Sequence, residues 1–297
     1  MPNHAPIALF VYNRLSHLHE TLNSLITNEL SSKSDLFIYS DGPKNSGDLI
    51  KVKSVRKYLK TISGFKTIQI IEKKINNGLA NSVINGVSEV LKKYPTVIVV
   101  EDDLQVSVDF LAFMNAALDF YSPNPEIFSI SGYNFPINIP TDYHADVYLS
   151  YRASSWGWAT WRDRWNKADW DVQDYQEFKK DRSAQRQFNR GGEDLTPMLH
   201  KQIKGIIDSW AIRWAYSHFR NDARCIFPIK SRVKNIGTDS SGTHSGNTNK
   251  YDVALNIEGE SVMLTNNLKL NAEILRNMRK VVQPSLFRRV LNHLKYQ

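Results

Sequence analysis

Three adjacent carboxylates, Glu101-Asp102-Asp103, directly follow the apolar run 97–100. Two like charges about 4 Å apart cost about 4 kcal/mol near a protein surface, so such a triplet at the end of a buried strand calls for a compensating cation. A divalent cation prefers hard oxygen ligands, and one or two carboxylates suffice where a diphosphate and water complete its shell. The triplet also fits a solvated acidic turn that caps the next helix. Taken alone, it leaves the metal site and the acidic turn equally open.

The first half of the chain alternates strand-like and helix-like patterns. This alternation predicts an α/β fold with a mostly parallel, doubly wound sheet and helices on both faces. Ligands of such sheets bind beyond the carboxyl ends of the strands, where Arg14, Asp41, the triplet and Asn134 fall. In the second half, the apolar spacing predicts one long helix over about 197–219. We predict strands at 7–12, 36–39, 67–71, 96–100 and 127–130, and helices at 15–26, 51–60, 78–93 and 110–121.

Length and composition exclude several classes of protein. The 297 residues suit one large α/β domain or two small ones. The single cysteine, Cys225, excludes an internal disulfide, and no apolar run reaches the length that spans a membrane. The N-terminus lacks the basic segment of a signal peptide, so we expect a cytoplasmic protein.

The net charge of +8 is unevenly distributed, which argues against a nucleic-acid partner. Residues 101–200 carry a net charge of −7, whereas residues 271–297 carry +5. We therefore expect a basic helical tail, residues 266–297, after a domain formed by residues 1–265. The segment 271–297 predicts a pair of amphipathic helices broken at Pro284. This pair is expected either to contact an anionic membrane peripherally or to pack on protein.

From Ile7 to about Asn247, the order of motifs resembles that of inverting glycosyltransferases of the GT-A fold. It is similar in particular to N-acetylglucosaminyltransferase I and its bacterial relatives in surface-polysaccharide synthesis. The resemblance implies that Glu101 and Asp102 bind the donor nucleotide and that Asp103 binds Mn²⁺ or Mg²⁺. It further implies that Arg14 reaches the nucleotide and that Asp41 reads the uracil of a UDP-sugar. Residues 1–134 would then form the nucleotide-sugar half.

Residues 135–265 would form the acceptor half and a closing loop. The segment 131–134 resembles the family's strand end with its asparagine, here Asn134. Trp156-Gly157-Trp158 resembles its aromatic turn on the acceptor side. His244 lies in the expected closing loop and is a further candidate for binding the metal or the diphosphate. The implied acceptor pocket thus contains Asn134, Trp156, Gly157 and Trp158.

The catalytic base of the resembled family is an aspartate directly before a tryptophan. Here the segment reads Asp208-Ser209-Trp210, so the carboxylate comes one residue early. Asp208 is the first candidate, and Glu193-Asp194 is the rival pair. The base would take the proton of an acceptor hydroxyl as its oxygen attacks C1 of the sugar from the opposite face, which inverts the anomeric carbon.

The resemblance implies transfer of a hexosyl or N-acetylhexosaminyl group from a UDP-sugar to a hydroxyl of a glycan or lipid-linked glycan, with a role in cell-surface polysaccharide synthesis. Two other interpretations remain. A nucleotidyltransferase acting on sugar phosphates would share the fold and the metal, but it would normally carry a glycine-rich loop after the first strand, where this chain has Tyr12-Asn13-Arg14. A noncatalytic sugar-nucleotide-binding protein would need neither a metal nor a base.

Overall fold

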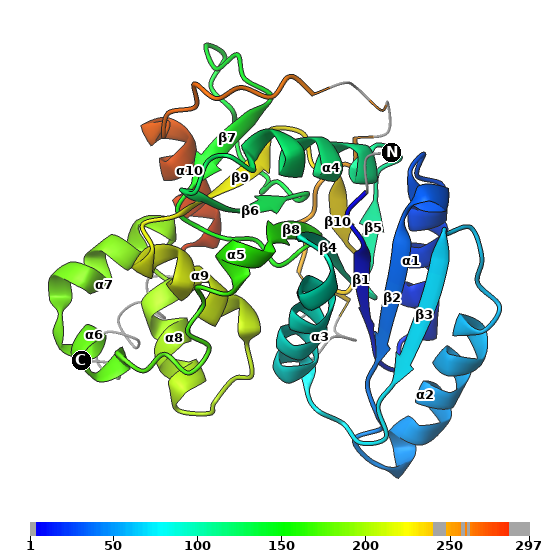
Figure 1. Ribbon diagram of the computed structural model, residues 1–297. Helices are drawn as coiled ribbons and strands as arrows, with labels where there is room; N and C mark the ends of the chain where they lie inside the picture. Colours follow the sequence, from blue (N-terminus) through cyan, green and yellow to red (C-terminus); the bar gives the residue numbers. More distant parts are fainter. Residues whose placement is uncertain (1–3, 240–247, 257–258, 260–261, 285–297) are drawn as a thin grey trace.

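The computed structural model describes residues 4–239, 248–256, 259 and 262–284 (Figure 1). Its centre is an eight-stranded sheet in the order β3-β2-β1-β4-β8-β6-β9-β7. Strands β3, β2, β1 and β4 are parallel, and β6 is parallel to β9. Strands β8 and β7 run antiparallel to their neighbours. The strands are β1 (Ile7–Val11), β2 (Asp35–Ser40), β3 (Thr67–Glu72), β4 (Thr96–Glu101), β6 (Ile127–Ser131), β7 (Val147–Ser150), β8 (Trp158–Trp161) and β9 (Arg224–Pro228).

Helices cover both faces of this sheet, which confirms the predicted α/β class (Figure 1). A second, two-stranded antiparallel sheet joins β5 (Leu104–Val106) to β10 (Val233–Asn235). The α-helices are α1 (Leu15–Ile26), α2 (Ser46–Leu59), α3 (Leu79–Lys93), α4 (Phe110–Tyr121), α5 (Arg162–Trp165), α6 (Tyr175–Lys180), α7 (Arg182–Phe188), α8 (Leu195–Ile203), α9 (Trp210–Arg220) and α10 (Ala272–Val282).

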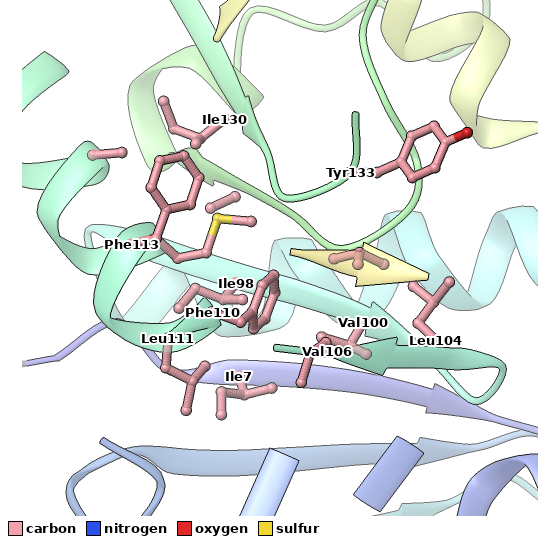
Figure 2. Close-up of a cluster of buried hydrophobic side chains, with 14 of the residues drawn as sticks. Ile7, Ile98, Val100, Leu104, Val106, Phe110, Leu111, Phe113, Ile130 and Tyr133 are labelled. Carbon is pink, nitrogen blue, oxygen red and sulfur yellow. The ribbon is translucent and has the colours of Figure 1, made fainter. Parts of the chain in front are cut away.

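The buried strands contribute side chains to two core layers, because successive side chains of a strand point to opposite faces of the sheet. In β1, Ile7, Leu9 and Val11 belong to the layer that contains α1 and α4. Ala8 and Phe10 belong to the layer beneath α3. Figure 2 shows part of the first layer, with Phe110 and Leu111 of α4 close to Ile7 of β1 and Ile98 of β4. Strands this apolar on both faces read as continuous hydrophobic runs, which explains why the sequence revealed them.

The predicted long helix over 197–219 is wrong, because the chain forms two helices, α8 and α9, separated by residues 204–209. Gly205, with φ of +68°, takes the left-handed conformation that ends a helix at little cost. The Ser209 side chain then accepts the N–H of Ile212 and begins α9. The break places Asp208 in a connection rather than on a helix.

The described part of the tail packs on the domain. Three side chains of α10, Ile274, Met278 and Val282, are buried, and they belong to the same core layer as α1 and α4. The second predicted helix of the tail falls mostly within 285–297, outside the described residues. Every helix in the described ranges is too short or too polar to cross a bilayer.

Candidate active site

The carboxylate triplet lies at the carboxyl end of β4, in the turn that leads to β5. Glu101 is the last residue of β4, and the backbone of the next two residues is held from two directions. Thr21 of α1 donates its hydroxyl to the Asp102 carbonyl at 2.9 Å and accepts the N–H of Leu104 at 3.1 Å. The N–H of Ile236 donates to the Asp103 carbonyl at 2.9 Å. The turn is therefore fixed by a helix on one side and by the chain after β10 on the other.

Arg14 bridges two of the three carboxylates. Its Nη2 lies 2.5 Å from Oδ1 of Asp102 and 2.9 Å from Oδ2 of Asp103. The other oxygen of Asp102 accepts the N–H of Tyr12 at 3.1 Å. Burial by itself would lower the pKa of Arg14, but the charges of Asp102 and Asp103 outweigh it and raise that pKa. Arg14 therefore stays a cation and orients both aspartates.

One guanidinium does not neutralise three carboxylates. Burial raises the pKa of Glu101 to about 8, and the charges of Asp103 and Asp102 act in the same direction, against Arg14. Burial likewise raises the pKa of Asp102, although Arg14 opposes the shift. The Nη1 atom of Arg14 is also buried without a hydrogen-bond partner in the described protein. The site thus has an excess of negative charge and an unused donor beside it, as a site for a cation and an anionic ligand should.

The donor set fits a divalent cation that shares its shell with a ligand. Asp103 offers hard carboxylate oxygens, and a Cβ added to Gly237 would collide with its Oδ2 atom, so glycine keeps room beside it. Within the described ranges, no three His, Cys, Asp or Glu side chains gather as a closed metal centre. The remaining ligands would therefore come from a diphosphate and water. His244, the further predicted ligand, lies outside the described residues.

Asp41 follows β2 and organises the turn that begins α3. Its carboxylate accepts the N–H groups of Gly42 and Asn77 at 2.9 Å and that of Gly78 at 3.1 Å. A cavity of about 180 Å³ is lined by Asp41 and Asn77, by Tyr39 of β2 and by side chains of α3 from Asn81 to Lys92. The predicted nucleotide-reading residue therefore lies at a hollow on the carboxyl edge of the sheet.

A second group of residues holds the end of β1, and sequence reasoning missed it. The Tyr12 hydroxyl donates to Oδ2 of Asp48, and the Asn13 amide donates to Oδ1, both at 2.9 Å. The Tyr12 oxygen in turn accepts the N–H of Lys44 at 3.0 Å. No sequence signal pointed to Asp48, because the helix predicted at 51–60 starts after it, whereas α2 starts at Ser46. This network fixes Tyr12 and Asn13, the two residues that lead into Arg14.

The two candidate bases lie in different surroundings. Asp208 is exposed, and its Oδ2 atom accepts the N–H of Ala80 at 3.4 Å. The same atom is 2.9 Å from the position of a Cβ on Gly78, which has φ of +78°. Asp208 therefore shares the first turn of α3 with Asp41.

Asp194 pairs with Arg152 instead. The two side chains form parallel bonds of 2.9 Å and 2.8 Å and are 17% and 15% exposed. Burial would lower the pKa of Arg152, and the Asp194 carboxylate reverses this shift and raises it. Glu193, the other member of the predicted pair, is exposed. The bidentate pair therefore fixes the direction of the Asp194 carboxylate.

The predicted acceptor residues divide into core and surface. Trp158 is fully buried and stacks on Trp210 and Trp165, with ring centroids 5.0 Å and 5.7 Å apart. The amide of Asn134 donates to the carbonyl of Ile229 at 2.7 Å and accepts the hydroxyl of Tyr148 at 2.8 Å. Trp158 therefore belongs to the core, and Asn134 is held by the fold while it also lines a cavity with Phe135; their place in an acceptor pocket stays a prediction.

Trp156 lies nearer the surface of this region, and the buried Gly157 follows it. Trp156 is half-buried, and its ring packs edge-on against Tyr133 at 4.6 Å and Tyr251 at 5.9 Å. Gly157 has φ of +56°, and a Cβ there would collide with Val233. Glycine is therefore required for the turn that presents Trp156.

Comparison with known proteins connects this geometry to a family. Searching curated protein sequences found no match. Among solved structures, TarS from S. aureus superimposes with a TM-score of 0.42 and 12% identity, over 77% of this chain and 36% of TarS. This chain thus spans about a third of TarS. The mannosyltransferase PcManGT from Pyrobaculum calidifontis, solved with GDP-Man and Mn²⁺, superimposes with a TM-score of 0.36 and 13% identity, over 71% of this chain and 73% of PcManGT.

A sequence model of glycosyl transferase family 2 matches residues 7–180. The matched segment contains Arg14, Asp41 and the triplet, and it ends before Asp194 and Asp208. It also covers more than half of the chain. With the GT-A arrangement of the sheet and the carboxylates at the end of β4, the match identifies this protein as a member of glycosyl transferase family 2.

Proposed function

We propose that this glycosyltransferase moves a hexosyl or N-acetylhexosaminyl group from a UDP-sugar to a hydroxyl of a glycan or lipid-linked glycan, with inversion at the anomeric carbon. Cell-surface polysaccharide synthesis at the cytoplasmic side of the membrane is the setting we infer. The observation that carries the proposal is the triplet at the end of β4, with Arg14 between Asp102 and Asp103 and glycine at position 237.

Each donor-site residue has a distinct role in this proposal. Asp103 would hold Mn²⁺ or Mg²⁺, with Asp102 and Glu101 on the ribose side of the nucleotide. The cation, when bound, neutralises the diphosphate as it leaves. Arg14, with its unused Nη1 atom, would donate to a diphosphate oxygen while it keeps Asp102 in place. The Asp41 carboxylate would accept the imide N–H of uracil at the cavity beside it.

Asp194 is favoured over Asp208 as the catalytic base. Asp208 shares the first turn of α3 with Asp41, which in this proposal lies at the nucleobase end of the donor. The sugar is attached at the other end of the diphosphate, so the base belongs on the far side of the triplet from Asp41. Asp194 is held by Arg152, which belongs to the connection that leads to Trp156. A carboxylate has about four lone-pair sites, so the paired Asp194 can still accept the acceptor's proton.

Trp156 is the side chain we favour for contact with the acceptor. Its half-buried ring offers the flat apolar face that suits a sugar, and Gly157 sets its position. Peripheral membrane contact through the tail, the other expected partner interaction, now depends on residues 285–297, because α10 uses its apolar side chains inside the fold.

Calorimetric titration of UDP tests the donor site. We expect UDP to bind with Mn²⁺ present and to bind at least about tenfold more weakly in EDTA or with Asp103→Asn, since each removes the cation that faces the diphosphate. Asp119→Asn, an exposed aspartate on α4, is the matched control and should bind UDP like the natural chain. A folded protein that binds UDP equally with Mn²⁺ and with EDTA would refute the metal site, and one that binds no UDP would refute the nucleotide.

A further inference from the structure

Large exposed apolar side chains gather at one edge of this protein. In the described ranges, five such residues lie on three segments near the candidate active site. Two others lie elsewhere, Val108 before α4 and Met263 in the segment before α10. The five are Leu49 and Ile50 on α2, Ile75 between β3 and α3, and Ile203 and Ile206 around the α8–α9 connection. We call these five side chains the edge surface.

Hydrogen bonds tie the three segments to one another. The Asn76 amide donates to the carbonyl of Gly42 at 2.9 Å, which joins the loop bearing Ile75 to the loop before α2. Asp208 accepts the N–H of Ala80 and so joins the α8–α9 connection to the start of α3. Figure 1 places the start of α2, the β3–α3 connection and the α8–α9 connection along the same lower edge. The edge surface is therefore one side of the molecule, the side where the parallel strands end.

The exposed fractions are large for isoleucine. Ile50, Ile75 and Ile206 are 74%, 71% and 61% exposed. Single exposed apolar residues are normal, but several on one side, among polar residues, mark an interaction surface. A lipid bilayer can take up such side chains from separate segments, because it is apolar and deformable.

Exposed lysines outnumber the exposed carboxylates of Glu72 and Asp208 on these segments. Exposed lysines accompany every segment: Lys44 and Lys51 around the start of α2, Lys74 beside Ile75, and Lys204 between Ile203 and Ile206. Asp48, the acidic residue nearest to Ile50, is turned to Tyr12 and Asn13. Isoleucines that alternate with lysines fit a surface that is apolar inside and anionic outside, as an anionic bilayer is.

We propose that the edge surface docks the protein on an anionic lipid membrane. The isoleucines enter the interface between headgroups and acyl chains, and the lysines contact the lipid phosphates. In the described part of the tail, α10 does not offer Ile274, Met278 and Val282 to a membrane, because these side chains are buried in the domain. Given the proposed function, this orientation turns the donor site toward the bilayer and favours an acceptor carried by a lipid.

Cosedimentation with vesicles tests the proposal directly. The full chain should pellet with vesicles of phosphatidylglycerol and phosphatidylcholine and stay in solution with phosphatidylcholine alone. Ile75→Ser combined with Ile206→Ser should lower the partition constant by about tenfold or more, because two apolar anchors are lost. Lys74→Gln combined with Lys204→Gln should lower it by about tenfold and reduce its sensitivity to salt. Val108→Ser combined with Met263→Ser is the matched control and should leave binding unchanged.

Other variants distinguish membrane docking by the edge surface from anchoring by the tail and from an interface between copies of the chain. Arg288→Gln combined with Arg289→Gln should still pellet; if this pair abolishes binding while the isoleucine pair does not, the tail is the anchor and the proposal is wrong. If light scattering shows a dimer that the isoleucine pair dissociates, and no vesicle binding occurs, the surface is an interface between copies. If the double variant Ile75→Ser with Ile206→Ser does not fold, Ile50→Ser on the exposed side of α2 tests the same loss of vesicle binding. Asp103→Asn should keep vesicle binding, so failure of the donor-site proposal is recognised separately.

Discussion

Arg14 and Asp103 form an ion pair at the place where we propose that a cation binds. The Nη2 atom of Arg14 lies 2.9 Å from Oδ2 of Asp103, and the same nitrogen lies 2.5 Å from Asp102. Arg14 therefore holds the two aspartates in place before any ligand arrives. In the proposed function, a cation and a diphosphate would balance the charges of Asp102, Asp103 and Arg14.

Removal of Arg14 should destabilise the protein as well as the site. Arg14→Ala leaves the buried Asp102 with only the N–H of Tyr12, and breaking such a pair costs about 3–5 kcal/mol. Urea denaturation measures this loss. The matched control is Arg276→Ala, which removes an exposed ion pair at 3.9 Å and should change the free energy of unfolding by less than about 1 kcal/mol. Equal losses in the two variants would contradict the bridging role of Arg14.

Gly237→Ala should weaken cation binding without unfolding the protein. The added Cβ would collide with Oδ2 of Asp103 and push that carboxylate away from its present position. Calorimetry should show UDP binding in Mn²⁺ weakened by about tenfold or more, with the melting temperature nearly unchanged. Gly47→Ala, where the nearest atom is 3.2 Å away, should bind UDP as before. Unaltered affinity in Gly237→Ala would show that Asp103 has no constrained part in the site.

The two aspartates proposed as base should respond differently to neutralisation. Asp194→Asn should lower kcat by about 10²–10⁴-fold while UDP binding is kept, because a general base contributes a factor of that size. Asp208→Asn should lower kcat by less than about tenfold, since its carboxylate serves the first turn of α3, where an acidic group is worth about 1 kcal/mol or less. Sugar transfer measured with both variants decides between them, and the reverse order would restore Asp208 as the base.

Buried His218 should make the protein sensitive to acid. Its Nε2 lies 2.8 Å from Oγ of Ser129, and its Nδ1 lies 2.9 Å from the carbonyl of Trp214. Burial lowers the pKa of His218 to about 4, Arg224 adds to this shift, and the Trp214 carbonyl opposes it. The unfolded chain, with a histidine pKa of about 6.5, binds this proton first. The free energy of unfolding should therefore fall as pH falls from about 6.5 to about 4, by up to about 3 kcal/mol.

Urea midpoints between about pH 7 and about pH 5 measure the effect. His218→Gln should be less stable at neutral pH but should show a flatter dependence in this range. His144→Gln, an exposed histidine, should keep the slope of the natural chain. An unchanged slope in His218→Gln would mean that His218 does not titrate in this window.

The sequence revealed the parts of the fold that local patterns determine. The apolar runs around Ile7, Leu36 and Val97 gave strands at the expected places, because strands buried on both faces need apolar residues at every position. The same reasoning located Arg14, Asp41 and Asp103 on one edge, since parallel strands end together. Gly205 shows where local periodicity fails: the apolar spacing continues through it, yet the backbone turns.

Roles that depend on tertiary contacts could not be read from spacing. Trp158 and Trp156 belong to one motif, but the first lies in the core and the second near the surface, according to which side of β8 and its turn each occupies. Thr21 and Asp48 look like ordinary helix residues. They hold the triplet and the end of β1 because of partners 83 and 36 positions away along the chain.

The antiparallel direction of β8 sets how far apart the ends of β4 and β6 lie. Strands β4 and β6 both end at the same edge, but β8, which lies between them, begins there. Two interstrand spacings, about 10 Å, therefore separate β4 from β6, and Ser131 is level with Val99 across β8. The reversed strand thus acts as a spacer that sets the distance between the carboxylate triplet at the end of β4 and the segment that follows β6.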